Sequence, residues 1–182
     1  MSTPTFETRR LLLKPLTLAD SHAIQRIFPN WEIVEFLLSA VPWPYPEDGA
    51  QAYIKDVALP AVERGEEWAW TIRLRSSPDA IIGSISLFKK EGENRGYWLD
   101  PDYHGVGLML EACEATNQFW FETLGRPFLR ELKAAANVAS VRLSERQRMK
   151  LVWQGERDFV SGRLPAQLWE ISVQEWRKTC AS

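Results

Sequence analysis

The sequence has few of the residues that build disulfide frameworks or metal sites. It contains two cysteines, Cys113 and Cys180, and two histidines, His22 and His104, among 182 residues. Two cysteines do not make a disulfide framework, and these four residues offer no ligand cluster for zinc. We therefore expect no metal site and a reducing, cytoplasmic setting.

An excess of one charge and long apolar runs are also missing. The 22 Lys and Arg residues nearly balance 24 Asp and Glu residues, which leaves a net charge of −2. Because nucleic-acid binders carry a basic footprint, this balance gives no reason to expect a nucleic-acid partner. No apolar run approaches the roughly 18 residues that span a bilayer, and residues 1–10 lack the apolar core of a signal peptide. We expect neither nucleic acid nor a membrane as a partner.

What the sequence does contain is ordinary for one folded domain. Hydrophobic residues make up 45% and charged residues 25% of the chain, which is typical of a globular protein. A chain of this length is expected to form one domain, residues 1–182, with a substantial core. Nine tryptophans are many for this length, so some are available to line a site as well as to fill the core.

Periodicity and turn residues divide the chain into strands and helices. The expected strands are 10–14, 68–73, 80–88, 95–99, 128–135, 150–159 and 164–173, and the expected helices are 18–28, 31–38, 50–64, 108–123 and 138–147. The short turns between successive strands favour antiparallel pairing. The sequence therefore predicts an α+β fold with a mixed, mostly antiparallel twisted sheet of about seven strands flanked by helices.

The segment Tyr97–Met109 passes from a strand through two glycines into a helix. Gly105 and Gly107 allow backbone conformations and close approaches that a Cβ would block. The first N–H groups of the following helix have no partner inside it, so they can bind phosphate. A tight turn without a ligand explains the two glycines equally well. No Gly-x-x-x-x-Gly-Lys-Ser/Thr run is present, which argues against a P-loop nucleotide-binding protein.

Four stretches resemble the GNAT superfamily of acyl-CoA-dependent N-acyltransferases, and within it the RimJ/RimL-like subgroup, whose named members acetylate N-termini of ribosomal proteins. They are T-R-R-L-L-L-K-P-L-T-L-A-D (8–20), I-I-G-S-I-S-L (81–87), G-Y-W-L-D-P-D-Y-H-G-V-G-L-M-L-E-A (96–112) and N-V-A-S-V-R-L-S-E (137–145). Together they cover nearly the whole chain in the order of the family. The resemblance implies a GNAT-type sheet and acetyl-CoA as co-substrate.

The resemblance also implies where acetyl-CoA binds. Its pantetheine arm would lie in a wedge between the fourth and fifth strands, with backbone groups of Trp98 and Leu99 offered to its amides. Backbone N–H groups would cradle the pyrophosphate, and diphosphate charge suits the positive end of a helix without a lysine. The residues of this cradle are His104, Gly105, Val106, Gly107, Leu108 and Met109.

Two polar residues match the catalytic end of the subgroup. Asn137 and Ser140 are spaced i, i+3 and so share one face of a helix. The resemblance implies that Asn137 lies near the acyl or pantetheine end of the cofactor. It implies that Ser140 lies near the sulfur and donates a hydrogen bond to the departing thiolate. An N-cap alone would also explain Asn137.

Some positions depart from the family pattern. Many members carry a Glu base on the fourth strand, and the nearest position here is Asn94, so that base is not clearly present. Asp102 and Val106 stand where Gln or Arg and a basic residue are common, and Arg148 stands where a glycine is expected to end the later helix. Glu111 sits one turn after the glycines, where structural and functional roles stay equally open.

Aromatic residues indicate the acceptor side. Trp43 and Tyr45 lie between prolines on a loop, in a region that forms the acceptor side in this superfamily. An aromatic cleft would suit an apolar or cationic group or a peptide backbone. Trp68 and Trp70, spaced i, i+2 on one strand face, are expected in the core.

Taken together, the resemblance predicts an N-acetyltransferase. It would transfer an acetyl group from acetyl-CoA to a primary amine by direct attack in a ternary complex. A covalent intermediate at Cys113, inside a helix, is not expected. The alternative is a non-catalytic acyl-CoA-binding or regulatory protein of the same fold. The acceptor (a protein N-terminus or a small-molecule amine) is left open, as is a homodimer.

Overall fold

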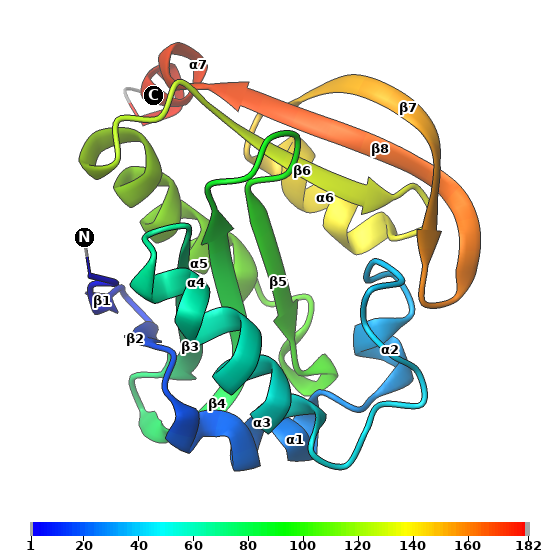
Figure 1. Ribbon diagram of the computed structural model, residues 1–182. Helices are drawn as coiled ribbons and strands as arrows, with labels where there is room; N and C mark the ends of the chain where they lie inside the picture. The colour runs from blue at the N-terminus through cyan, green and yellow to red at the C-terminus, as the bar shows by residue number, and fades with distance from the viewer. Residues whose placement is uncertain (1, 181–182) are drawn as a thin grey trace.

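The chain folds into two antiparallel sheets with helices around them, which confirms the α+β prediction (Figure 1). The computed structural model describes residues 2–180. Within them, one sheet has five strands in the order β1-β2-β3-β4-β5, and the other has three in the order β6-β8-β7. The strands are β1 (Phe6–Glu7), β2 (Leu11–Pro15), β3 (Glu67–Leu74), β4 (Ser77–Phe88), β5 (Arg95–Leu99), β6 (Phe128–Ala134), β7 (Lys150–Phe159) and β8 (Gly162–Ser172).

Helices pack on both faces of the five-stranded sheet, α1 to α4 on one face and α5 on the other (Figure 1). Among residues 2–180 no helix is long and apolar enough to span a bilayer. The helices are α1 (Ser21–Ile27), α2 (Trp31–Val34), α3 (Gly49–Tyr53), α4 (Leu59–Glu63), α5 (Leu108–Gln118), α6 (Val138–Arg146) and α7 (Val173–Cys180), with π-helical turns η2 (Ile54–Ala58) and η4 (Phe119–Thr123) and 3-10 turns η1 (Leu18–Asp20) and η3 (Pro101–Tyr103).

Short-range signals set where several of these elements begin and end. Thr17 and Asp20 form a capping box, in which the Thr17 N–H donates to Asp20 Oδ2 at 2.8 Å. The helix expected at 50–64 is divided into α3, η2 and α4, with Pro60 in the first turn of α4. Because proline lacks an N–H and crowds the preceding turn, it cannot continue a regular α-helix.

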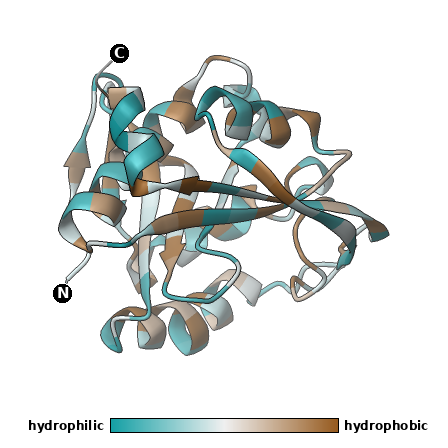
Figure 2. Cartoon of the chain, turned by 90° about the horizontal axis from the view of Figure 1, so that it is seen from above, coloured by the Kyte–Doolittle hydropathy of each residue, from teal (hydrophilic) through white to brown (hydrophobic). Residues whose placement is uncertain are grey.

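The core is built by strands that are apolar on both faces. Trp68 and Trp70 on β3 are 3% and 0% exposed and pack toward α5, as expected for core residues. Ala69, between them, points to the opposite face and packs under α1 to α4. Successive residues of a strand point to opposite faces, so β3 contributes to both clusters. Figure 2 shows apolar and polar residues interspersed along the helices and strands of the chain.

The two sheets meet at one point and then separate. Asn94 N–H donates to the Arg130 carbonyl at 2.8 Å, and Arg130 N–H donates to Asn94 Oδ1 at 3.0 Å. Beyond this point no ladder joins β5 to β6 within residues 2–180, although each strand is paired on its other side. The two strands therefore form a wedge, as the family resemblance implied.

The structure differs from the expected elements in three respects. The strands form two sheets and not one, because the separation of β5 from β6 is decided by packing rather than by sequence pattern. β1, with two residues, is too short to give a periodic signal. The last expected strand, 164–173, ends at Ser172, and α7 follows it, with Trp176 buried.

Candidate active site

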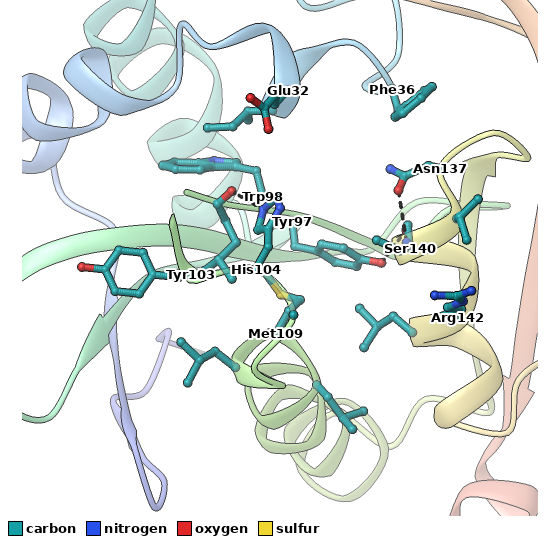
Figure 3. A pocket seen from close by; sticks show the side chains of 18 of the residues that line it. Glu32, Phe36, Tyr97, Trp98, Tyr103, His104, Met109, Asn137, Ser140 and Arg142 are labelled. Carbon is teal, nitrogen blue, oxygen red and sulfur yellow. Dashed lines mark hydrogen bonds between the residues drawn. The ribbon is translucent and has the colours of Figure 1, made fainter. Parts of the chain in front are cut away.

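A pocket of about 600 Å³ lies at the wedge, a volume in the range of small-molecule sites (Figure 3). Four elements build its walls: β5, the loop from β5 into α5, the first turns of α6, and α2. The tip of the β7–β8 hairpin holds α2 and the residues after it, because Val160 N–H donates to the Leu37 carbonyl at 2.9 Å and Ser161 N–H to the Glu35 carbonyl at 3.1 Å. Segments far apart in the chain thus close one site.

The edge of β5 that faces away from β4 is left free by the wedge. Asp100 N–H donates to the Ile82 carbonyl and Phe88 N–H to the Asn94 carbonyl, both at 2.8 Å. In the register between these two bonds, the backbone groups of Trp98 face Ser84 of β4, inside the sheet. Alternate residues of a strand direct their backbone groups to opposite sides. Trp98 therefore uses its backbone inside the sheet and reaches the pocket with its side chain. Tyr97 and Leu99 are the residues whose backbone groups face the wedge, so Tyr97 replaces Trp98 in the expected pair.

The glycine loop has the geometry of a helix-end anion site. Gly105 and Gly107 have φ of +77° and +82°, and Gly107 is the N-cap of α5. Both line the pocket together with His104, Leu108 and Met109. Val106 is outside the lining and exposed, and its carbonyl accepts from Arg10 Nη1 at 2.8 Å. Of its two backbone groups, the carbonyl is therefore already hydrogen-bonded within the protein.

The side chain of His104 is turned back onto β5. Its Nε2 donates to the Leu99 carbonyl at 2.9 Å, since a carbonyl oxygen can only accept. This bond fixes the start of the loop against the end of the strand. It also leaves the N–H of Leu99 and both backbone groups of Tyr97 as the hydrogen-bonding groups of the free edge.

Asn137 and Ser140 lie together at the start of α6, as the sequence predicted. Asn137 Oδ1 accepts from the Ser140 N–H at 3.1 Å, which is an N-cap bond. Helix capping therefore accounts for the amide oxygen of Asn137 but not for its amide nitrogen. Both residues line the pocket. Figure 3 shows the amide nitrogen of Asn137 on the side away from Ser140, directed toward the pocket. One amide can therefore cap the helix and also donate to a ligand.

Behind Ser140 lies a buried lysine that the sequence did not point out. Lys133 Nζ donates to Tyr97 Oη at 2.6 Å and to Ser140 Oγ at 3.0 Å, and the two hydroxyls are 2.8 Å apart. Tyr97 and Ser140 line the pocket, whereas Lys133 stands behind them and is 5% exposed. Burial raises the pKa of Tyr97, so its phenol keeps its proton at neutral pH.

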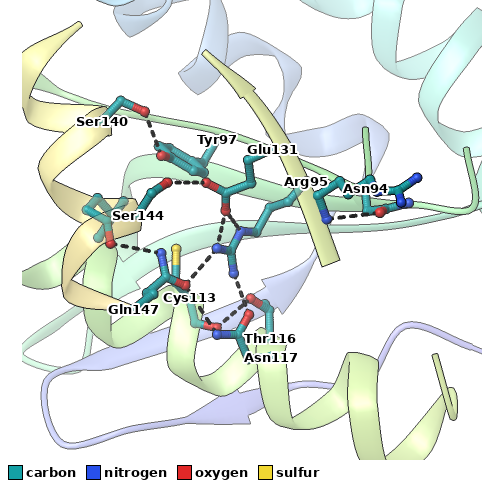
Figure 4. Close-up of polar contacts among 12 residues, drawn as sticks. Asn94, Arg95, Tyr97, Cys113, Thr116, Asn117, Glu131, Ser140, Ser144 and Gln147 are labelled. Carbon is teal, nitrogen blue, oxygen red and sulfur yellow. Dashed lines mark hydrogen bonds and ion pairs between the residues drawn. The ribbon is translucent and has the colours of Figure 1, made fainter. Parts of the chain in front are cut away.

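Glu131 neutralises this lysine from the same strand. Its carboxylate pairs with Lys133 and Arg95 and accepts from Ser144 Oγ at 3.2 Å (Figure 4). Arg95 donates further to Asn117 Oδ1 at 2.5 Å and, through Nη2, to the side chain of Gln147 at 2.7 Å. Burial would raise the pKa of Glu131, but Arg95 and Lys133 lower it to about 2. The carboxylate is therefore ionised throughout the neutral range.

Asn94 and Glu111, the two positions considered from sequence for an acidic role, have structural partners instead. Asn94, nearest the position of the expected base, is 8% exposed, and its Nδ2 donates to the Lys90 carbonyl at 2.7 Å. Glu111 faces away from the pocket and accepts from Thr8 Oγ1 at 2.5 Å and from Arg10 Nε at 2.7 Å. Burial opposes ionisation of Glu111, but these donors hold its pKa below the usual value. Neither residue reaches the pocket.

The expected acceptor residues lie outside the lining of the pocket. Trp43 is half-exposed and packs on Trp31, with ring centroids 5.4 Å apart. Tyr45 packs edge-on against Phe28 at 4.9 Å and joins the core under α1 to α4. The α2 side of the pocket is lined instead by Glu32, Glu35 and Phe36, among others.

The pocket carries opposite charges on two sides. Glu32 of α2 lies across it from Arg142 of α6 (Figure 3). Arg142 and Arg146 are both exposed and line the pocket, and their i, i+4 spacing puts them on one face of α6. The α6 side therefore suits phosphates, and the α2 side suits a cation.

Cys113 lacks the exposure and the ionisation of a nucleophile. Cys113 is 0% exposed, and burial raises the pKa of its thiol to about 11, so it is a poor nucleophile at neutral pH. Within residues 2–180 no three His, Cys, Asp or Glu side chains gather as they would around a metal ion.

Comparison with known families decides the classification. The family model described as an acetyltransferase (GNAT) domain matches residues 10–150. The chain belongs to the GNAT acetyltransferase family. The matched residues include the wedge, the glycine loop and α6.

Solved structures of the same fold agree with this GNAT assignment. One is RimL, a ribosomal L7/L12 α-N-protein acetyltransferase in complex with coenzyme A, at 15% identity and a TM-score of 0.78, covering 93% of this chain and 98% of that one. A second is the ribosomal-protein-S5-alanine acetyltransferase of Vibrio fischeri, at 14% identity and 0.79, covering 95% and 98%. A third is a GNAT-family acetyltransferase of Bacillus anthracis, at 17% identity and 0.74, covering 94% and 100%.

Proposed function

We propose that this GNAT protein transfers an acetyl group from acetyl-CoA to a primary amine, by direct attack within a ternary complex. The observation that carries the proposal is the continuity of the pocket. It joins the N-terminus of α5 to the hydroxyls of Tyr97 and Ser140 along the free edge of β5. A pyrophosphate, a pantetheine arm and a thioester need these features in this order.

The phosphate end of acetyl-CoA is bound by backbone groups. The N–H groups of Gly105 to Met109 lie at the start of α5, whose dipole favours a diphosphate. The His104 N–H, expected to join them, donates instead to the Pro101 carbonyl at 3.0 Å. The guanidinium groups of Arg142 and Arg146 supply positive charge on the neighbouring wall. The amides of the pantetheine arm bind the free edge of β5 as an added strand would.

The amine reaches the thioester from the side of α2. Glu32 and Glu35 attract an ammonium group to this wall, and the amine attacks after it has lost a proton. Trp43, which packs on Trp31 next to Glu32, belongs to the outer part of the acceptor surface, whereas Tyr45 serves the core. RimL and the S5-alanine enzyme are named for protein α-amino groups, which supports a protein N-terminus as the acceptor.

Thiol release from acetyl-CoA tests this function. The purified protein is incubated with acetyl-CoA and a panel of amines that includes peptides with free N-termini, and free thiol is measured with time. We expect thiol release that depends on the amine, and a new acetyl group on the amine by mass spectrometry. Tight acetyl-CoA binding without release by any amine would instead support the non-catalytic acyl-CoA-binding alternative.

A further inference from the structure

The Lys133 ammonium has all of its donors in use. An ammonium carries three N–H groups, and Lys133 directs them to a Glu131 carboxylate oxygen, Tyr97 Oη and Ser140 Oγ. Both hydroxyl oxygens therefore accept from the same cation. Burying a lysine beside two neutral hydroxyls costs free energy unless the charge is paired, and Glu131 supplies that pairing.

The two hydroxyls then have one hydrogen left over. Tyr97 Oη and Ser140 Oγ are 2.8 Å apart, so one of them donates to the other. The remaining hydroxyl hydrogen has no acceptor within the cluster, and both residues line the pocket. Whichever of the two holds it, one O–H donor is left for a ligand, and the Lys133 ammonium contacts the same oxygens.

We propose that Lys133 is a positioning residue that lowers the pKa of the coenzyme A thiol through Tyr97 and Ser140, and so stabilises the departing thiolate. The inference rests on the proposed function, because that function puts the sulfur beside these hydroxyls. A donor hydroxyl backed by an ammonium favours an anion on the sulfur, whereas two isolated hydroxyls would not.

The reaction step balances with these groups. The amine nitrogen bonds to the thioester carbonyl carbon, the C–S bond breaks, and its electron pair goes to sulfur. The free hydroxyl donates a hydrogen bond to the thiolate that forms, with the Lys133 ammonium beside it. The amine nitrogen loses its proton to water, so the products are the acetylated amine, the coenzyme A thiolate and a hydrated proton.

Other charged groups around Lys133 set the field that the sulfur experiences. Arg95 of β5 and Glu131 of β6 pair with one another as well as with the lysine cluster. Cys113 of α5 stays a neutral thiol, and Glu93, before β5, has a pKa raised by burial. The single carboxylate of Glu131 is thus shared between two cations, Arg95 and Lys133.

The test is the pKa of the thiol of bound coenzyme A, measured from its ultraviolet thiolate absorbance in a pH titration. We expect a thiol pKa at least about one unit below that of free coenzyme A in the wild type. Lys133→Met should move it back by about one unit or more, which is a tenfold loss of thiolate at a given pH. Lys133→Arg, which keeps the charge, should retain most of the shift.

Matched ligands and variants separate this idea from a structural role. Binding of S-methyl-coenzyme A, which has no ionisable thiol, should be unchanged in Lys133→Met. Where that variant does not fold, the pair Tyr97→Phe and Ser140→Ala, which removes both hydroxyls, should raise the thiol pKa in the same way. The inference is overturned if the thiol pKa of coenzyme A bound to the wild type equals that of free coenzyme A. It is also overturned if the lowered thiol pKa persists in these variants. Failure of the wild type to bind coenzyme A at all would overturn the proposed function as well.

Discussion

At the scale of single residues, two buried carboxylates illustrate how partners decide ionisation. Glu131 pairs with two cations, which lower its pKa to about 2 although burial opposes this. Glu67 on β3 is 4% exposed, and its Oε1 is buried with no hydrogen-bond partner. Burial raises the pKa of Glu67 to about 7, an effect that a hydrogen bond with Ser86 only partly offsets. The charged form of the carboxyl group is therefore stabilised at Glu131 and destabilised at Glu67.

This contrast predicts that Glu67→Gln stabilises the protein at high pH. A carboxyl whose folded pKa lies above its unfolded value binds more protons in the folded state, so stability falls as pH rises from 4.5 through about 7. At about 1.4 kcal/mol per pKa unit, the substitution should recover up to about 3 kcal/mol above pH 7 and nothing below pH 4.5. Urea denaturation at several pH values measures the difference.

Glu66→Gln is the matched control for this prediction. Glu66 is the exposed neighbour of Glu67 and pairs with Arg64 at 2.8 Å, and surface pairs of this kind contribute little. Its substitution should leave the pH dependence of unfolding close to that of the wild type. A Glu67→Gln protein whose stability curve parallels the wild type at every pH would contradict the assignment.

Single-residue patterns also explain why Lys133 could not be identified from the sequence as a buried residue of the site. Residues 128–135 alternate as a strand, and the inward positions after Leu129 are Glu131 and Lys133. Charged residues at such positions are read as exposed unless partners are known. Their partners come from β5, α5 and α6, which only the folded chain brings together.

At the scale of elements, the glycine loop and α5 act as one unit. Gly107→Ala should weaken coenzyme A binding about tenfold, because φ of +82° strains an L-residue by about 1–2 kcal/mol. Relief of that strain turns the N–H groups at the start of α5 away from the pyrophosphate. Calorimetric titration with coenzyme A measures the loss.

Gly92→Ala provides the comparison for the loop. Gly92 has φ of +84° in the turn before β5, and a Cβ there would meet nothing within 4 Å. Both substitutions should lower stability by similar amounts, but Gly92→Ala should leave the affinity for coenzyme A unchanged. Equal affinities of the two variants for coenzyme A would show that the glycine loop is not part of the binding site.

The face of α6 that carries Arg142 and Arg146 makes a second prediction at this scale. Alanine at both positions should weaken coenzyme A binding at least about tenfold, since charge-assisted bonds to phosphate contribute about 1.5–3 kcal/mol. Binding of dephospho-coenzyme A should change less if these arginines bind the 3′-phosphate. Titrations of both ligands, with Arg26→Ala on the exposed face of α1 as control, decide this. Equal losses for both ligands would place the arginines at the pyrophosphate instead.

The end of α6 shows how a family feature can be met by a different residue. Arg148 has φ of +57°, in the left-handed region where the family pattern has glycine. Its N–H donates to the Glu145 carbonyl at 2.9 Å, and Met149 N–H donates to the Ser144 carbonyl at 3.0 Å. These bonds end the helix as a glycine would. The departure at Arg148 therefore leaves the cleft intact, at the cost of local backbone strain.

At the scale of the whole molecule, the site depends on two sheets that join at Asn94. Asn94→Ala should lower the free energy of unfolding by about 2–3 kcal/mol, because it leaves the Arg130 N–H and the carbonyls of Phe88 and Lys90 without their partner. It should also weaken coenzyme A binding, since the base of the wedge is released. Urea denaturation and calorimetric titration measure the two effects.

Gln25→Ala controls for the loss of a bridging amide elsewhere. Gln25 Nε2 donates to the Pro46 carbonyl at 2.9 Å, and its Oε1 accepts from the Ala50 N–H at 2.9 Å, far in the chain from the wedge. Gln25→Ala should lower the free energy of unfolding but leave the affinity for coenzyme A unchanged. Unchanged affinity in a destabilised Asn94→Ala protein would show that the wedge does not need this joint.

The sequence by itself determined the order of elements, the α+β class, the glycine loop and the pairing of Asn137 with Ser140. These features are local: turn residues, apolar periods and an N-cap are set by neighbours within a few positions. Trp68 and Trp70 were placed in the core by their spacing alone.

The tertiary structure alone decided the features that need distant partners. It separated β5 from β6, turned the backbone of Tyr97 and not Trp98 to the pocket, and buried Lys133 behind Ser140. It also put α2, rather than Trp43 and Tyr45, on the wall opposite α6. Burial and the pairing of charges depend on every element packed around a residue, so no local pattern contains them.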